Sequence, residues 1–590
     1  MIRILAVVFL LSSSVSAGMT VARLPISGTP DFVRVAKDVI AARIAMDPSN
    51  ASGAGLFEDS AVVPSFAPAN VEALHRRFES DILALKAMPW RNWSVDQQID
   101  FRWIYANARA ADHVLMSEKP YLHRPGAWLE PLANNFIALL TYAPERVDLR
   151  EKVWPLIPPM VAEIRATAVP TSRDVVTTLG LIDGLLKMLA AEKGAPARDA
   201  AAASLSAYAN DLKALKNLPE FAVVGADNYA WILNNEELFP WTPAQLLALA
   251  QSELELVGAR MAELKPKLTP EPTPTPEQTE LAKSLTREKL LGLYDQIVKD
   301  DRAALEKSGV ITVPRGVGPI HARETPDAMV PLTGDGGSMN PPPTYVKSNV
   351  GYWNVEHFHA DWTLDRRLEA VMGALNQRVN GMGPYAAHEG IPGHHLQLSI
   401  ARLNTDPIRS VLPDGVQNEG WALYAEEMFQ RAGGLGPSVD AQYQTLDSWR
   451  FRVRRVVYDV NVESGFWSLQ QAGDFKSSAT EPGKGTVDED VLRAVNWPAQ
   501  LICYFSGPRS SGSARTTKRR WARPTPTATS TTSFWPWVRS RSSSPGPSCW
   551  ASRFPTSISR RRCLRRHQTD LGGSLVSSTT QRLAPARARI

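Results

Sequence analysis

The stretch HEGIPGHH at residues 388–395 contains three histidines and one glutamate within eight residues. A glutamate follows His388 directly, and two further histidines come six residues (His394) and seven residues (His395) later. In the common HExxH pattern, histidines four residues apart share one face of a straight helix and bind one ion. At about 100° per residue, a six-residue spacing turns His394 off that face. A seven-residue spacing restores the face, but the helix rises about 10.5 Å over that distance, too far for one ion.

The residues between the histidines predict a local distortion of the helix. Pro392 lacks a backbone N–H and clashes with the preceding turn, and Gly393 tolerates dihedral angles that other residues avoid. We therefore expect the helix to bulge here, as helices often do at functional sites. With Glu419 downstream, the residue types are typical of a zinc hydrolase. The alternative is a histidine-rich helix end in a loop that binds no metal.

Two segments resemble a known family. HEGIPGHHLQL at 388–398, followed by NEGWALYAEE at 418–427, is similar to the bacterial domain-of-unknown-function family 885. That family is grouped with zinc metallopeptidases of the gluzincin type, such as thimet oligopeptidase, angiotensin-converting enzyme and carboxypeptidase Taq. The resemblance runs from about residue 30 to 507 and is strongest at 385–427 and 496–507.

The resemblance implies a site with one Zn²⁺ ion. It assigns His388, His394 and Glu419 as the ligands and Glu389 as the base that activates the water. His395 is the rival second ligand, but the family pattern favours the histidine that directly follows the glycine. Two neutral imidazoles and one carboxylate leave a fourth coordination position for water, which is typical of a catalytic zinc site.

Several other residues each have two interpretations. Glu426 lies seven residues after Glu419, and either accepts a hydrogen bond from a ligand histidine or is a solvated helix charge. Tyr504 matches a Tyr-x-x-Gly segment of the family, and either donates to the oxyanion of a tetrahedral intermediate or is simply buried. His357 and His359, two apart on one face of a strand, either line the cleft or lie on the surface.

One position departs from the family pattern. Glu463, at the end of DVNVE (459–463), stands where many members of the family carry a histidine. If that histidine assists the transition state, this chain uses Glu463 differently or belongs to a distinct subgroup.

Residues 1–17 have the pattern of a secretory signal peptide. Arg3 is a short positive region, residues 4–11 form an apolar run, and VSA at 15–17 is a small-residue cleavage site. The run is too short to span a bilayer, and no cysteine follows the cleavage site, so we do not expect a lipoprotein. We expect a periplasmic or secreted chain that begins near Gly18; the alternative is a buried N-terminal helix.

The composition changes sharply after Gly507. Residues 508–590 contain 17 Lys and Arg but one acidic residue, whereas residues 1–507 hold 48 basic and 59 acidic residues. The net charge of +5 therefore comes from the tail. A basic tail can be a nucleic-acid arm, but four tryptophans in a Ser/Thr/Arg/Pro background fit a disordered arm poorly. Back-translated with GC-rich codons, the tail reads in a shifted frame as an amphipathic, helix-forming sequence, so we expect a frameshift.

We predict that residues 508–590 form no packed domain. One acidic side chain cannot balance the tail's charge, and scattered prolines interrupt helices. Limited proteolysis should digest the tail and leave a body that ends near Gly507. Restoring the reading frame should raise the soluble yield and the thermal midpoint of the protein. A stable protected fragment covering 508–590 would instead indicate a functional basic domain.

The rest of the chain predicts a mainly α fold, and the resemblance implies a large helical metallopeptidase-like architecture. We expect an N-terminal helical region over residues 18–308 and a catalytic region over 309–507. Short β-runs between 309 and 353, punctuated by Gly and Pro, predict a small sheet or hairpin before the motif helix. Hydrophobic periodicity predicts helices at 71–87, 94–118, 129–140, 147–167, 175–192, 198–215, 243–264, 277–307, 365–380, 417–432 and 440–457. Ser94 with Gln97 is a capping-box start, and Thr242-Pro243 is a second helix start.

These features predict a secreted zinc-dependent hydrolase that cleaves peptide or other amide bonds. The alternative is a non-catalytic binding protein, or a pseudoenzyme that is inactive because of the aberrant C-terminus. A peptide or amide substrate is the expected partner. Nucleic-acid binding and stable membrane insertion after signal cleavage are not expected.

Overall fold

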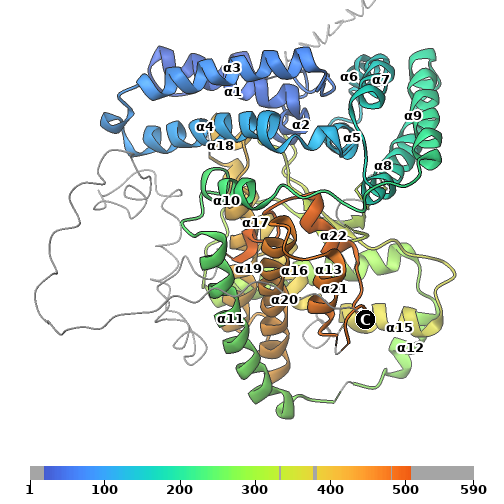
Figure 1. Ribbon diagram of the computed structural model, residues 1–590. Helices are drawn as coiled ribbons and strands as arrows, with labels where there is room; N and C mark the ends of the chain where they lie inside the picture. The colour runs from blue at the N-terminus through green and yellow to red at the C-terminus, as the bar shows by residue number, and fades with distance from the viewer. Residues whose placement is uncertain are drawn as a thin grey trace, which may run out of the picture. The chain divides into compact units, whose positions relative to one another are not determined.

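The computed structural model describes residues 19–505, except residues 271, 328, 331–333, 376–381, 405, 437 and 480. The expected signal peptide (1–17) and the expected frameshifted tail (508–590) lie outside the described residues. The described part consists mainly of helices and contains a three-stranded sheet (Figure 1). The prediction of a mainly α fold with a small β element is confirmed.

Helices α1–α9 make up the first part of the described chain. Their bounds are α1 Pro30–Met46, α2 Ser49–Ala54, α3 Pro68–Ala87, α4 Val95–His113, α5 Gly126–Tyr142, α6 Val147–Val153, α7 Ile157–Thr167, α8 Ser172–Ala191 and α9 Pro196–Ala214. The predicted capping box begins α4: the Gln97 N–H donates to Ser94 Oγ at 3.3 Å, and the Ser94 N–H donates to Gln97 Oε1 at 3.3 Å. The helix expected at 147–167 is split by the 3₁₀ turn Trp154–Leu156, because Pro155 has no N–H to donate.

The later helices carry the residues of the motif. Their bounds are α10 Ala226–Asn235, α11 Pro243–Leu264, α12 Pro276–Lys283, α13 Arg287–Ser308, α15 Leu364–Leu375, α16 Met382–Glu389, α17 His394–Arg402, α18 Pro407–Val411, α19 Gly415–Arg431, α20 Val439–Glu463, α21 Leu469–Ser477 and α22 Glu489–Asn496. The predicted start at Thr242 is confirmed, since the Gln245 N–H donates to its Oγ1 at 3.2 Å and Pro243 is the first helical residue. A short 3₁₀ segment, η7 (Cys503–Phe505), ends the described chain.

The sheet has the strand order β1-β3-β2. Strand β1 (Ile320–Glu324) is parallel to β3 (Gly351–Val355), and β2 (Ser338–Asn340) is antiparallel to β3. The sheet therefore forms before the motif helix, as predicted, but its β1–β3 pair is parallel. The run at 310–314 is not a strand. Its apolar side chains pack instead against the core that contains Leu305 and Leu396.

The hydrophobic cores show which helices support the motif. One core joins α1–α9 with residues 408–412 of the later chain. A second core joins α10 and α11 to α20 and to residues 499–505, so these two helices pack with the later part of the chain although they precede residue 308. Helix α20 is therefore enclosed along much of its length, and the side chains on its inner face are held in place.

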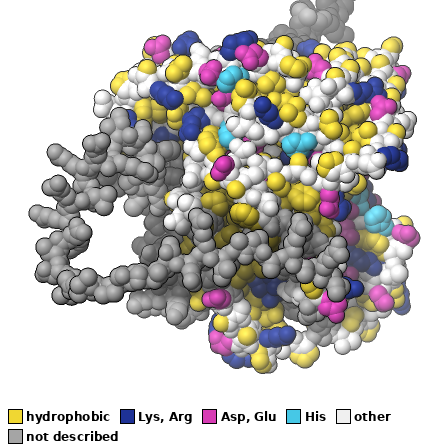
Figure 2. All heavy atoms as spheres, viewed as in Figure 1, with side chains coloured by type: hydrophobic (Ala, Val, Ile, Leu, Met, Phe, Trp, Pro, Cys, Tyr) yellow, Lys and Arg dark blue, Asp and Glu magenta, His cyan; other side chains and the backbone are white. Residues whose placement is uncertain are grey.

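Charge is mixed on one face of the molecule (Figure 2). Figure 2 shows acidic and basic side chains intermingled on the face that it draws, without a large field of one sign. Among the described helices, none combines the length and the apolar character that crossing a bilayer requires.

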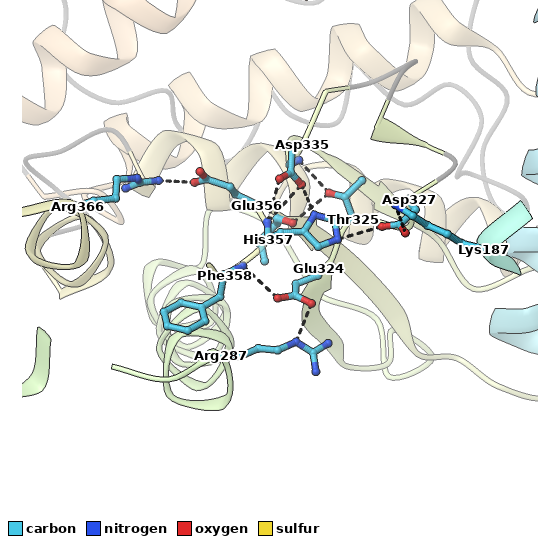
Figure 3. A network of polar contacts seen from close by, with 12 residues as sticks. Lys187, Arg287, Glu324, Thr325, Asp327, Asp335, Glu356, His357, Phe358 and Arg366 are labelled. Carbon is cyan, nitrogen blue, oxygen red and sulfur yellow. Dashed lines mark hydrogen bonds and ion pairs between the residues drawn. The ribbon is translucent and has the colours of Figure 1, made fainter. Parts of the chain in front are cut away.

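His357 belongs to a polar network at the end of the sheet (Figure 3). Its Nδ1 lies 2.8 Å from Asp335 Oδ1, and its Nε2 lies 3.4 Å from Asp327 Oδ1. Lys187 of α8 reaches the other oxygen of Asp327 at 3.1 Å. His359 is exposed. Of the two histidines considered as cleft residues, His357 is therefore engaged in a surface network and His359 is directed to solvent.

Candidate metal centre

The helix carrying the motif is interrupted rather than bulged. Helix α16 ends at Glu389, residues 390–393 form a turn, and α17 begins again at His394. A side chain at Gly393 has no room, because a Cβ there would lie 1.8 Å from the carbonyl oxygen of His388. Buried Trp421 of α19 holds the turn from outside, since its Nε1–H donates to the Pro392 carbonyl at 2.9 Å.

We predict that Gly393→Ala destabilises the fold. The added methyl group collides with backbone, which cannot rotate away as a side chain can. Overpacking of this kind costs about 1–3 kcal/mol or more, so the thermal midpoint should fall by several degrees. Gly258→Ala in α11 is the matched control: a Cβ added there would meet nothing within 4 Å, and alanine favours the helix. Equal midpoints for the two variants would contradict this account of the turn.

The interruption brings three predicted ligands together. One donor atom from each of His388, His394 and Glu419 lies within 4.8 Å of the others. Glu419 Oε2 is 3.6 Å from His388 Nε2 and 3.2 Å from His394 Nε2. The two imidazole rings are nearly perpendicular, with centroids 4.7 Å apart. The end of α16, the start of α17 and the first turns of α19 thus direct three donor atoms toward one point.

Glu426 fixes the orientation of His388. Its Oε1 lies 2.8 Å from His388 Nδ1, and both residues are buried. Because a carboxylate accepts, Nδ1 carries a proton whether the ring is neutral or charged, and Nε2 faces the cluster. Of the two interpretations of Glu426, the hydrogen bond to a histidine of the motif is the one that the structure contains.

His395 points away from the cluster. Its Nε2–H donates to the carbonyl oxygen of Gly318 at 2.9 Å, just before β1. The imidazole lies close against β3, since a Cβ on Gly351 would be 2.5 Å from His395 Nδ1. Burial lowers the pKa of His395 to about 4, so the ring is neutral at physiological pH. Of the two adjacent histidines, only His394 lies with His388 and Glu419.

Glu389 lies next to the cluster without belonging to its donor set. The residue is 4 % exposed, and its Oε2 is buried with no hydrogen-bond partner among the described residues. Burial raises its pKa, and the positive charges of His394 and His388 offset part of that rise. A carboxylate with an unused acceptor and a raised pKa is suited to take up a proton.

Tyr504 packs against the cluster. The segment η7 places its ring 6.0 Å from the ring of His388, with an interplanar angle of 20°. The residue is 5 % exposed, and burial raises the pKa of the phenol. The group therefore stays protonated and remains a hydrogen-bond donor at physiological pH.

Glu463, the departure from the family pattern, lies outside the cluster. It is completely buried at the end of α20, and its Oε2 accepts from the Val224 N–H at 3.0 Å. Burial raises its pKa to about 8. Its neighbour Asp459 accepts from the Tyr229 hydroxyl at 2.5 Å. These contacts tie α20 to α10 and to the segment that leads into it.

The charges of the centre favour a bound cation. Glu389, Glu419 and Glu426 place three carboxylates around His388. Burial alone would lower the pKa of His388, but the neighbouring Glu419 and Glu426 carboxylates outweigh it and raise the pKa to about 9. Burial likewise opposes ionisation of Glu419, yet the charges of His394 and His388 hold its pKa well below the usual range. The donor set thus needs positive charge, either a proton on an imidazole or a metal ion.

Three polar residues of the site were not predicted from the sequence. Ser448 donates to Glu426 Oε2 at 2.5 Å, and Arg452 donates in turn to Ser448 Oγ at 2.7 Å. Gln500 donates to Glu419 Oε1 at 3.2 Å. The available signal was the four-residue spacing of Ser448 and Arg452, which puts both on one face of a helix otherwise rich in buried apolar residues.

Solved structures share this fold. A candidate lipoprotein of unknown function from Shewanella oneidensis is 17% identical, with a TM-score of 0.62 over 83% of this chain and 94% of that chain. A candidate lipoprotein from Colwellia psychrerythraea is 15% identical, with a TM-score of 0.60 over 85% of this chain and 96% of that chain. At these identities the likeness is one of fold alone. No curated protein matches the chain significantly in sequence.

A family model covers the centre as well as most of the fold. The model described as "Bacterial protein of unknown function (DUF885)" matches residues 48–520, which include α16, α17, α19 and Tyr504. The family suggested by the motif segments is therefore the correct one. This chain belongs to DUF885, a family of bacterial proteins of unknown function.

Proposed function

We propose that this chain is a zinc-dependent hydrolase of peptide or other amide bonds. The observation that carries the proposal is the convergence of His388, His394 and Glu419 in a largely buried site beside Glu389. The motif segments resemble family 885, and the grouping of that family with gluzincin peptidases supports the same chemistry. In this proposal the three converging residues hold the ion and Glu389 is the base.

Two of the three separations within the donor set fit a zinc ion. Two ligand atoms about 2.1 Å from one ion, at a tetrahedral angle, lie about 3.4 Å apart. The contacts of Glu419 Oε2 with the two Nε2 atoms, at 3.6 and 3.2 Å, bracket that value. A bound zinc supplies a positive charge that polarises a carbonyl group and acidifies water.

The residues around the ion divide the remaining work. Glu389 removes a proton from the attacking water and returns it to the nitrogen of the leaving amine, which balances the hydrolysis. Tyr504, a buried donor beside His388, stabilises the negative charge that develops on the carbonyl oxygen. Glu426 and Ser448 keep His388 in the tautomer that a ligand needs.

An exported location belongs to the same proposal. The signal-peptide pattern at residues 1–17 supports it, and the two structural neighbours, described as candidate lipoproteins, are consistent with a place in the cell envelope.

Metal analysis and peptide digestion of the purified full chain test the proposed function. The proposal expects about one zinc for each chain and cleavage of a synthetic peptide mixture, followed by mass spectrometry. Bound zinc without cleavage would favour the binding-protein alternative. A protein that takes up no zinc would favour a pseudoenzyme.

A further inference from the structure

Three arginines lie near Tyr504. Arg452 and Arg455 come from α20, and Arg493 comes from α22, which packs against α20. The guanidinium carbons of Arg455 and Arg452 lie 4.9 and 5.8 Å from the centre of the Tyr504 ring. Arg493 is close enough to influence the charge of the same phenol. These three residues are called the arginine cluster below.

The arginine cluster holds unused hydrogen-bond donors. Arg455 is 7 % exposed, and its Nε–H is buried without a partner in the described part of the chain. The Nε–H groups of Arg452 and Arg493 are in the same state. A buried N–H without an acceptor is unfavourable, and three of them beside one tyrosine indicate a place for an acceptor that is not part of the fold.

Internal carboxylates leave part of the positive charge unmatched. Asp490 accepts from Arg455, but it also receives the Tyr458 hydroxyl and lies 3.6 Å from Lys476. Arg452 comes no closer than 3.8 Å to Glu426, a carboxylate already bonded to His388 and Ser448. The cluster therefore favours an anionic acceptor.

Gln500 connects the arginine cluster to the metal centre. Arg493 donates to Gln500 Oε1 at 2.8 Å, and Gln500 donates through its Nε2 to Glu419 Oε1 at 3.2 Å. Arg452 is likewise joined to His388 through Ser448 and Glu426. An anion bound by the arginines would lie next to the reacting groups and not at a remote surface.

We propose that the arginine cluster binds the C-terminal carboxylate of a peptide substrate, which makes the chain specific for cleavage close to a free C-terminus. The proposal rests on the proposed function and names its substrate class. Guanidinium groups bind carboxylates through paired, charge-assisted hydrogen bonds. An extended residue spans about 3.4 Å. The centre of the Tyr504 ring lies 4.9 Å from the guanidinium carbon of Arg455 and 6.0 Å from the centre of the His388 ring. The carboxylate therefore belongs no more than about three residues beyond the scissile bond.

Calorimetric titration of the zinc-loaded Glu389→Gln chain with two peptides tests this proposal. The peptides are tetra-alanine with a free carboxylate and tetra-alanine amide, and the substitution prevents turnover from obscuring binding. The acid should bind about 10- to 100-fold more tightly than the amide, since one or two charge-assisted hydrogen bonds are lost in the amide.

Variants assign that preference to particular residues. Arg493→Gln and, separately, Arg452→Gln should reduce the acid-to-amide ratio at least severalfold. Arg454→Gln is the matched control from the same helix, because Arg454 already donates to the Lys476 carbonyl and to Ser478 Oγ. Its ratio should equal that of the parent chain, and thermal melts should show that all variants are folded.

The outcomes separate this proposal from the proposed function. If tetra-alanine binds no more tightly than tetra-alanine amide, the substrate assignment is overturned. A chain that binds neither peptide also overturns it. Variants that fold and keep the full ratio also overturn it. Zinc content and hydrolysis by the unmodified chain report on the proposed function independently of these titrations.

Discussion

Replacing Glu389 with glutamine should abolish most hydrolysis while zinc content and fold are kept. The amide has nearly the same shape as the carboxylate, but it cannot accept a proton from water. A positioned general base contributes about 10²–10⁴-fold to the rate, so kcat should fall by that factor. The measurement is the initial rate of peptide cleavage at equal zinc loading, with zinc determined by elemental analysis of the same samples.

Glu427→Gln provides the control for losing a buried carboxylate in this region. Glu427 is 5 % exposed and forms an ion pair with Arg431 at 2.6 Å. Its substitution therefore removes a buried charge but none of the three proposed metal ligands. Its rate should stay within a few-fold of the parent rate. If Glu389→Gln lowers the rate less than tenfold, Glu389 is not the base.

Substitution of the proposed metal ligands should have an equally large effect on zinc content. His388→Ala and Glu419→Ala each remove one of three protein donors, and the two that remain cannot hold the ion against dialysis. We expect less than about a tenth of the parent zinc content in each variant, because losing one ligand of three costs several kcal/mol of binding. Elemental analysis after dialysis against metal-free buffer is the measurement.

The adjacent histidines supply a sharp comparison for this prediction. His394→Ala should lose zinc, whereas His395→Gln should keep it, because His395 bonds Gly318 and not the cluster. A glutamine amide can still donate to that carbonyl. Full zinc content in both His388→Ala and Glu419→Ala would refute the ligand assignment, and loss in His395→Gln alone would exchange the roles of the two histidines.

Much of the local structure could be predicted because its causes are local. The capping box at Ser94 and the helix start at Thr242-Pro243 act over a few residues, and both begin helices in the structure. Glu426 was placed correctly as a candidate because seven residues bring it back to the face of Glu419. The run at 310–314 was misjudged, because β-branched residues there satisfy packing against Leu305 without joining a sheet.

The remainder of the site depends on contacts between distant segments. The sequence left the choice between His394 and His395 open, and it is decided by the position of Gly318 and Gly351 against α17. Ser448, Arg452 and Gln500 reach the centre from α20 and from the chain after α22, and no periodicity shows which helix faces which. The sequence predicted a bulged helix, whereas the structure has a break in which the carbonyl of His388 occupies the space beside Gly393.

That break resets the helical phase between the two halves of the motif. In an uninterrupted helix, a fixed residue count sets the angle between two side chains, so the count itself is what selection must preserve. Here α16 and α17 turn independently, and the angle between His388 and His394 follows from the path of residues 390–393. Motif definitions that require a four-residue spacing of the histidines will overlook such centres. The diagnostic position is instead one that has no side chain: Gly393, where the neighbouring carbonyl leaves room for a hydrogen atom only.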